Sequence, residues 1–367
     1  MRTRAKRPKS KAQPRVAAPA RHLQVFAAAS VRDLEPYRSA KREWSQRLLG
    51  PAVRAQGARA LTAATPAPQQ NVVGVGIGEK IVDGNATGIR CLKFLVRAKY
   101  PESQILPTNL LPNEVHGLPV DVEEVGTFRL LRKPRKPRVH PSAAPNPRVK
   151  IRPAQPGCSV GFQDPAGAFT MAGTFGAVVN DDGGTYILSN NHVLADENRL
   201  PAGAPIFQPG LLDGGNPSTD QIATLTKFVE LKADQNNQVD AAIAQVLKTS
   251  LVIRDILQIG PPSGVGQAAL DMVVHKFGRT TSYRAGRVTS IDTDVAVQYD
   301  AGTYTFESQM IIVGLDNQSF SDAGDSGSLI LERQSQTAVG LLFAGSASHT
   351  IGNHIGNVLD ALGVTLA

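Results

Sequence analysis

Residues 154–367 consist of short apolar runs separated by Gly, Asp and Asn, as in GAVVN, TYILS and AVGLLFAG. Such runs, joined by turn residues and without helical intervals, are typical of strands in a β-barrel or β-sandwich. Only one late segment has a helical pattern, with apolar residues on one face: Ile355, Val358, Leu359 and Leu362. We therefore expect a mainly β domain that contains one helix near its end.

The N-terminal part has a different pattern. A helix is predicted over about residues 34–49, before Gly50, because apolar side chains recur there at helical spacing: Leu34, Tyr37, Trp44 and Leu48. Residues 71–130 contain two β-like runs joined by turn residues at Asp83–Asn85, and a later third run, which predicts a small α+β module. The rest of residues 1–70 is interpreted as a basic disordered tail and a linker.

Residues 131–153 are rich in Pro, Arg and Lys and are predicted to form an extended linker ahead of the β domain. Basic residues are also concentrated at residues 1–21, and neither residues 1–21 nor residues 129–152 contain an acid. The net charge of +8 therefore arises from two segments, and the rest of the chain is acidic. Basic segments without aromatic residues give non-specific, salt-sensitive attraction to nucleic acid, so no specific nucleic-acid partner is expected.

The cysteine content and the apolar runs bear on the compartment. Cys91 and Cys158 are the only cysteines, which favours a reducing compartment over a disulfide framework. No stretch approaches the roughly 20 apolar residues of a membrane span, and the run LQVFAAAS is too short and too late for a signal peptide. We expect a cytoplasmic protein without a membrane partner. The His and Cys spacing predicts no metal site, and no cofactor is expected.

The candidate chemistry lies in AGDSGSLI, where Ser326 is surrounded by small residues. A serine hydroxyl becomes a nucleophile when a base contacts it and a carboxylate orients that base. His192 is the histidine that follows a strand-like run, in TYILSNNHVLADEN. Asp240 begins the run DAAIAQV, whereas the rival acids lie in polar or Gly-rich loops and remain alternatives: Asp213, Asp220 and Asp234.

These three segments resemble the histidine, aspartate and serine motifs of chymotrypsin-like (trypsin-like) serine proteases, in the same order. GRTTSYRAGRVTSI (Gly278–Ile291) and PGCSVGF resemble segments of bacterial streptogrisin-type members, here with an N-terminal extension. The resemblance covers about residues 157–364. It implies a chymotrypsin-like double β-barrel with the site between the barrels.

The resemblance also implies a role for each position. Ser326 attacks the scissile carbonyl, His192 takes and returns the proton, and Asp240 orients the imidazole. The backbone N–H groups of Gly324 and Ser326 form an oxyanion hole. Asp325 braces the loop through an ion pair with Lys276.

The substrate pocket is implied by the same comparison. Phe320 stands where the trypsin branch has an acid, which favours an apolar over a basic side chain before the cut, although Asp322 is left as an alternative acid in the pocket. Phe343, Ala344 and Gly345 are expected beside the substrate backbone. Ser328 replaces the glycine that is usual at its position, and the sequence offers no reason for this change.

Two functions from different classes follow. The first is a serine endopeptidase that acts on a protein or peptide substrate, with an N-terminal half that resembles a pro-segment and regulates it. The alternative is a catalytically inactive binding module on the protease fold, which recruits a partner through its N-terminal half, residues 1–130. The two are separated by whether Ser326 reacts with a serine-directed probe.

Overall fold

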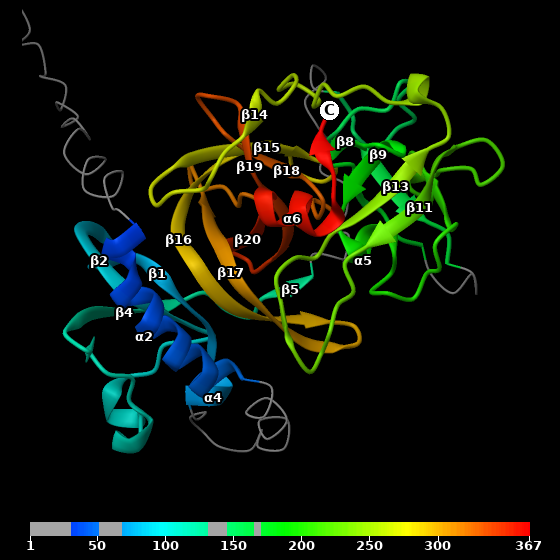
Figure 1. Ribbon diagram of the computed structural model, residues 1–367. Coiled ribbons are helices and arrows are strands. Elements are labelled where there is room, and N and C mark those ends of the chain that lie inside the picture. The colour runs from blue at the N-terminus through cyan, green and yellow to red at the C-terminus, as the bar shows by residue number, and fades with distance from the viewer. Residues whose placement is uncertain (1–30, 51–67, 131–144, 165–169) are drawn as a thin grey trace, which may run out of the picture.

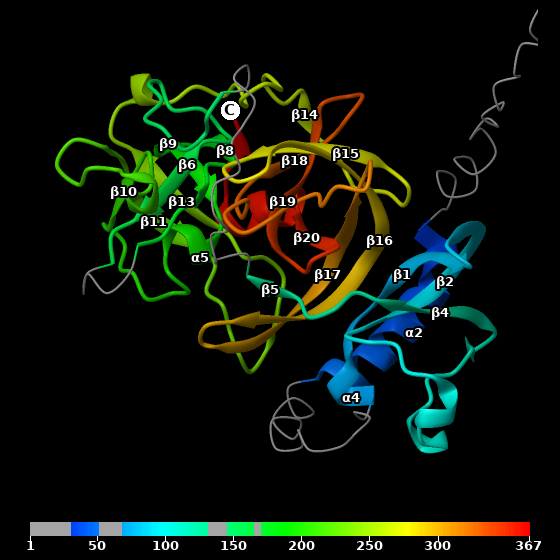
Figure 2. The same ribbon diagram turned by 180° about the vertical axis from the view of Figure 1, so that it is seen from behind.

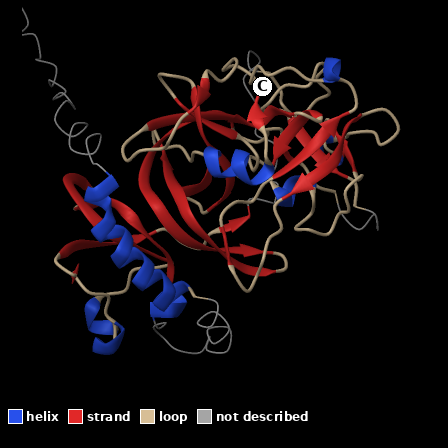
Figure 3. Cartoon of the chain, viewed as in Figure 1, coloured by secondary structure: helices blue, strands red, loops and turns tan. Residues whose placement is uncertain are grey.

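The structure is a computed structural model that describes residues 31–50, 68–130, 145–164 and 170–367. The predicted basic tail, most of the linker before residue 71 and the first part of the Pro-rich linker lie outside the described residues. Strands dominate the chain, and helices are few and short except for one near the N-terminus (Figure 3). The prediction of a mainly β protein is confirmed. None of the helices within these residues has the length and apolar character of a membrane span.

One curled sheet is antiparallel throughout, with strand order β21-β8-β9-β13-β11-β10-β6-β7 (Figure 1). Its strands are β6 (Ser159–Phe162), β7 (Gly173–Thr174), β8 (Ala177–Asp181), β9 (Gly184–Ser189), β10 (Pro205–Phe207), β11 (Gln221–Phe228), β13 (Ala242–Val246) and β21 (Thr365–Leu366). Their inward side chains form the largest apolar cluster of the described residues. The short helix α5 (Asn191–Leu194) follows β9 directly.

The second sheet contains a closed ring of strands. β16 pairs with both β15 and β17, which closes the order β15-β16-β17-β20-β19-β18 into a barrel. The strands of this part are β12 (Asn236–Asn237), β14 (Gly264–Val265), β15 (Val273–Gly278), β16 (Ser282–Tyr299), β17 (Gly302–Gly314), β18 (Leu329–Glu332), β19 (Thr337–Gly345) and β20 (His349–His354). The two curled sheets are consistent with a chymotrypsin-like double β-barrel.

Helix α6 (Ile355–Leu362) is the helix that the sequence predicted near the C-terminus. All four apolar residues of its predicted face are buried and join the core of the first barrel. Gly363 ends the helix in the left-handed conformation, at φ 71°, where an L side chain would be strained. The apolar face of the helix is therefore part of the core that the first barrel shares with β18 and β19 (Figure 1).

The N-terminal residues form a helix on a small sheet. The helix α2 (Val31–Leu49) begins three residues before the predicted start and packs on β1 (Val72–Val82) and β2 (Asn85–Val96) (Figure 1). Trp44 meets Phe94 edge to face, with ring centroids 5.2 Å apart. The remaining elements here are α4 (Pro68–Asn71), β3 (Glu114–Val115), β4 (Leu118–Glu124), β5 (Arg129–Leu130) and the 3-10 turns η1 (Glu102–Gln104) and η2 (Pro107–Asn109).

These N-terminal strands continue the sheet of the second barrel, because β1 pairs antiparallel with β16. The close approach needs glycine: a Cβ added at Gly76 would lie 2.3 Å from the Thr293 hydroxyl oxygen. Lys41 on α2 adds ion pairs to Asp292 (3.1 Å) and Asp294 (2.7 Å) on β16. The small α+β module predicted over residues 71–130 therefore shares a sheet with the second barrel, and a strand pattern alone does not specify such an edge.

The predicted linker is partly attached to the first barrel. Residues 145–153 are described, and Lys150 lies 2.5 Å from Asp220 in an ion pair. The Ile151 N–H donates to the side-chain oxygen of Gln208 at 2.9 Å. The first barrel also carries the 3-10 turns η3 (Leu211–Asp213) and η4 (Thr249–Leu251). The end of the Pro-rich segment is thus ordered on the barrel, because its backbone and charges find partners there.

Candidate functional site

The histidine and aspartate predicted from the sequence are in direct contact. His192 Nδ1 lies 2.6 Å from Asp240 Oδ2, and the His192 backbone N–H donates to Asp240 Oδ1 at 3.3 Å. His192 lies in α5, just after β9, and Asp240 lies just before β13, the strand that pairs with β9. Both side chains are fully buried. Sheet pairing therefore brings together two residues that are far apart in sequence.

The three rival acids are engaged elsewhere. Asp213 is paired with the buried guanidinium of Arg279, at 2.5 Å and 2.6 Å from its two carboxylate oxygens. Asp220 is paired with Lys150, and Asp234 is exposed in a loop. Of the four candidates, Asp240 is the acid that contacts His192.

Asp240 is held as a carboxylate by several donors. Tyr299, at the end of β16, donates its hydroxyl to Asp240 Oδ2 at 2.6 Å, the same oxygen that His192 contacts. Burial on its own would raise the pKa of Asp240, but the charge of His192 and the hydrogen bonds from His192 and Tyr299 bring it below its usual value. Tyr299 was not found from the sequence, because a strand pattern does not indicate which side chain of one barrel will contact a residue of the other.

Ser326 lies in the loop between β17 and β18, against the segment that carries His192. The backbone carbonyl of Ser326 accepts a hydrogen bond from the Thr174 N–H at 2.8 Å. A Cβ at Gly173 would lie 2.6 Å from Val193, the neighbour of His192, and 3.1 Å from the Ser326 carbonyl oxygen. Gly173 thus keeps the serine loop and the histidine turn close together. The Ser326 hydroxyl donates to the Phe343 carbonyl at 3.2 Å.

The backbone around Ser326 suits an oxyanion. Gly324 has φ 93°, and a Cβ there would lie 2.4 Å from Arg279 Nη1, so only glycine fits. Within the described part of the chain, neither the Gly324 N–H nor the Ser326 N–H donates a hydrogen bond. Two nearby N–H groups that donate no other hydrogen bond can both donate to an oxygen on which negative charge develops.

Asp325 is the centre of a buried network. Lys276 Nζ lies 3.1 Å from Asp325 Oδ2, and both side chains are fully buried. The other Asp325 oxygen accepts the N–H groups of Thr280 (2.8 Å) and Thr281 (3.1 Å). Burial opposes ionisation and by itself would raise the pKa of Asp325, but Lys276 and the Thr281 hydrogen bonds lower it below its usual value. The network ties the serine loop to the β15–β16 hairpin.

Ser328, which the sequence left unexplained, has a clear contact. Its hydroxyl donates to the Asp325 carbonyl at 2.6 Å, and its backbone N–H donates to the same oxygen at 3.0 Å. A glycine there would keep only the second bond. Ser328 therefore adds a fixed point to the turn that presents Ser326.

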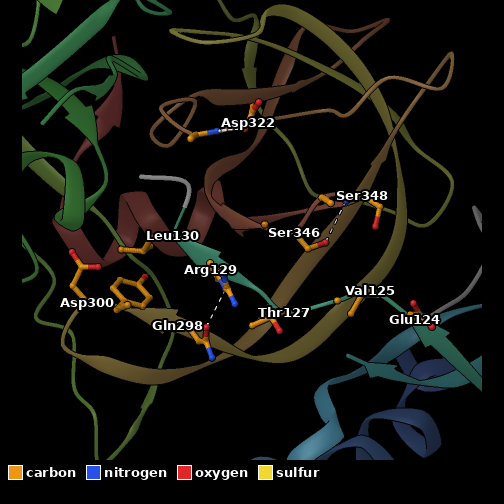
Figure 4. Close-up of a pocket in the computed structure, with 15 residues that line it drawn as sticks. Glu124, Val125, Thr127, Arg129, Leu130, Gln298, Asp300, Asp322, Ser346 and Ser348 are labelled. Carbon is orange, nitrogen blue, oxygen red and sulfur yellow. Dashed lines mark hydrogen bonds between the residues drawn. The ribbon is translucent and has the colours of Figure 1, made fainter. Parts of the chain in front are cut away.

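A pocket of about 810 Å³ lies beside the end of β19 (Figure 4). Its lining comes from four places: the segment after β4, the tip of the β16–β17 hairpin, the loop before Ser326 and the residues that end β19. Three acids line it, namely Glu124, Asp300 and Asp322. Asp322 therefore faces this pocket, as the alternative from the sequence allowed.

The four residues predicted to line a substrate pocket are placed differently from one another. Gly345 lines the 810 Å³ pocket. Phe320 is buried in an apolar cluster with Met310 and Ile330 and is not one of the lining residues. Phe343 and Ala344 are buried in a second cluster, and the Phe343 carbonyl accepts the hydrogen bond of the Ser326 hydroxyl. The apolar preference inferred from Phe320 therefore finds no support in this lining.

Comparisons with known proteins give structural matches alone. No family model and no curated protein sequence matches the chain. The chain is similar to Thermobifida fusca protease A, with 18% identity and a TM-score of 0.41 over 58% of this chain and 97% of that one. It is also similar to a glutamic acid-specific serine protease (19% identity, TM-score 0.41, 58% of this chain and 100% of that one). A third similar structure is an alpha-lytic protease homolog, N4 (18% identity, TM-score 0.40, 58% of this chain and 98% of that one).

Proposed function

We propose that the protein is a serine endopeptidase. The observation that carries this proposal is the 2.6 Å contact between His192 Nδ1 and Asp240 Oδ2, buried on a turn that packs against the loop of Ser326. A buried carboxylate on Nδ1 fixes the imidazole tautomer that keeps Nε2 for proton transfer. The substrate class is a protein or peptide.

The residues would act in two steps. Ser326 Oγ forms a bond to the scissile carbonyl carbon while its proton passes to His192 Nε2, and the oxyanion is held by the N–H groups of Gly324 and Ser326. The C–N bond then breaks, and His192 gives the proton to the leaving amine. In the second step His192 takes a proton from water, whose oxygen attacks the acyl carbon. The bond from that carbon to Ser326 Oγ then breaks, His192 returns the proton to Ser326 Oγ, and the acid product leaves.

A fluorophosphonate probe tests the proposal in the full chain. The probe is expected to label the wild-type protein, and labelling is expected to be lost in Ser326→Ala and His192→Ala. The control is Ser250→Ala, since Ser250 is exposed on the 3-10 turn η4 far along the chain from Ser326. Absence of labelling in the wild type would instead favour the inactive binding module.

Tyr299→Phe is expected to lower kcat/KM by about tenfold, because a hydrogen bond to a charged group is worth about 1.5 kcal/mol or more. Loss of this donor should raise the pKa of Asp240, because the Tyr299 hydrogen bond is one of the causes that lower it, so activity should be lost at a higher pH on acidification. The measurement is kcat/KM against pH, with Tyr304→Phe as the control, since its ring lies 4.9 Å from that of Tyr299. Superimposable profiles for Tyr299→Phe and wild type would show that the hydroxyl has no such role.

The N-terminal half is proposed to regulate this activity. The support is its position: β1 extends the sheet of the second barrel, and the segment after β4 lines the pocket beside β19. Glu123 on β4 lies 3.1 Å from His349 on β20 and 2.6 Å from Lys93 on β2. Desolvation by itself would raise the pKa of Glu123, but these two partners lower it to about 2. The N-terminal strands are therefore joined to the second barrel by charges as well as by the sheet.

A further inference from the structure

The short strand β5 lies between two strands of the second barrel (Figure 2). Along one edge it runs antiparallel to β19, with Leu130 opposite Ala344 and Arg129 opposite Gly345. Along its other edge Arg129 is opposite Gln298 of β16, whose N–H donates to the Phe128 carbonyl at 3.0 Å. Arg129 Nε also donates to the Gln298 side chain at 3.1 Å (Figure 4). The end of the N-terminal half is thus inserted as a strand.

This strand passes close to the candidate nucleophile. The Ser326 hydroxyl donates to the Phe343 carbonyl, and the next residue, Ala344, is the partner of Leu130. An extended peptide binds a sheet by adding a strand to an open edge, where its backbone makes the ladder hydrogen bonds. Ala344 and Gly345 lie beyond the part of β19 that pairs with β18, and here the edge is paired with β5. A strand edge can pair with only one other strand at a time. Because β5 pairs with Ala344 and Gly345, a substrate peptide cannot pair with these two residues while β5 is in place.

We propose that Thr127–Leu130 is an internal competitor that occupies the peptide-binding edge of β19. This inference rests on the proposed function and assigns the regulation of the same site. An extended peptide reaching Ser326 along β19 must first displace Arg129 and Leu130. In the full chain β5 therefore blocks the binding of extended peptides, which we call the self-block. A small reagent that needs no strand pairing still reaches Ser326.

The segment is held unequally along its length. Phe128 and Val125 are buried in the apolar cluster that contains Phe343, and Glu123 is paired with His349. Arg129 is exposed, and Leu130 is half-buried at the border of the same cluster, so both lie at the less buried end of the segment. Displacing β5 therefore leaves the anchor at Phe128 in place. Substitutions at positions 129 and 130 can open the edge while the buried side chains of Val125 and Phe128 stay in the cluster.

The test uses the full chain with Leu130→Asp and, separately, Arg129→Pro. Aspartate puts a charge in a half-buried apolar position, and proline removes a backbone donor. Both variants are expected to lower KM for an extended peptide by about tenfold with kcat unchanged. The reason is that, if β5 is displaced in about one in ten wild-type molecules, the apparent KM of the wild type is raised about tenfold. The matched control, Leu106→Asp, places the same charge on a side chain that is 63% exposed and outside the strands that pair with β19.

A capped peptide with the sequence of residues 125–130, VGTFRL, gives a second measurement. It is expected to inhibit the Leu130→Asp variant competitively, while a scrambled peptide does not. Unchanged KM in both variants, with no inhibition by VGTFRL, overturns the self-block. Labelling by the fluorophosphonate separates failure of the self-block from failure of the proposed function. If the wild type is labelled and KM is unchanged in the variants, only the self-block is refuted. If neither the wild type nor the variants are labelled or active, the endopeptidase proposal itself is refuted.

Discussion

Asp240→Asn is expected to lower kcat by about 10⁴ without unfolding the protein. The asparagine amide can occupy the space of the carboxylate, but it presents a donor to His192 Nδ1 and favours the wrong tautomer. It also removes the negative charge that stabilises the imidazolium formed when Ser326 attacks. The measurement is kcat for a peptide substrate, with the melting temperature followed in parallel. A direct hydrogen bond of 2.6 Å makes this one of the two largest effects that the structure predicts.

Asp234→Asn is the matched control, because Asp234 was a rival acid in the sequence and is exposed in the structure. Its kcat should equal that of the wild type. If Asp240→Asn retained kcat within tenfold of the wild type, while remaining folded, Asp240 would not be the orienting carboxylate. Equal losses in both variants would point to a general effect of charge instead.

Lys276→Ala is expected to destabilise the protein by about 3–5 kcal/mol and to abolish most of its activity, because it leaves the buried Asp325 carboxylate without its counter-charge. Burial opposes ionisation of Lys276 and lowers its pKa, and Asp325 is the charge that opposes this shift. Loss of the pair would release the turn that presents Ser326 and the Gly324 N–H. Urea unfolding and kcat/KM on the same samples measure the two effects.

Two variants make this prediction specific. Lys248→Ala removes an exposed lysine and should change stability by less than about 0.5 kcal/mol. The double variant Lys276→Met with Asp325→Asn removes both charges and should be more stable than Lys276→Ala, since no unpaired charge stays buried. A Lys276→Ala protein with wild-type stability and full activity is incompatible with a bracing role for the pair.

The resemblance located several of the contacts that the structure contains. It named His192 with Asp240, whose side chains meet at 2.6 Å, and Lys276 with Asp325, which lie 3.1 Å apart. It did not locate Tyr299, whose hydroxyl reaches Asp240 from the tip of a long hairpin. It gave no sign that Phe320 packs in an apolar cluster. A residue type at a motif position can be read from a sequence, whereas the direction of a neighbouring side chain depends on packing around it.

The sequence by itself determined the local elements and the residue types at the site. The period of the apolar residues specified the strands, and the four apolar residues of α6 specified its buried face, because both depend on neighbours within a few positions. Only the tertiary structure decided that β1 joins β16, that Asp213 pairs with Arg279, and that β5 lies on β19 beside Ser326. Each of these contacts joins segments that are distant in the sequence. A strand pattern indicates that a strand has an edge, but it does not indicate which other strand pairs with that edge.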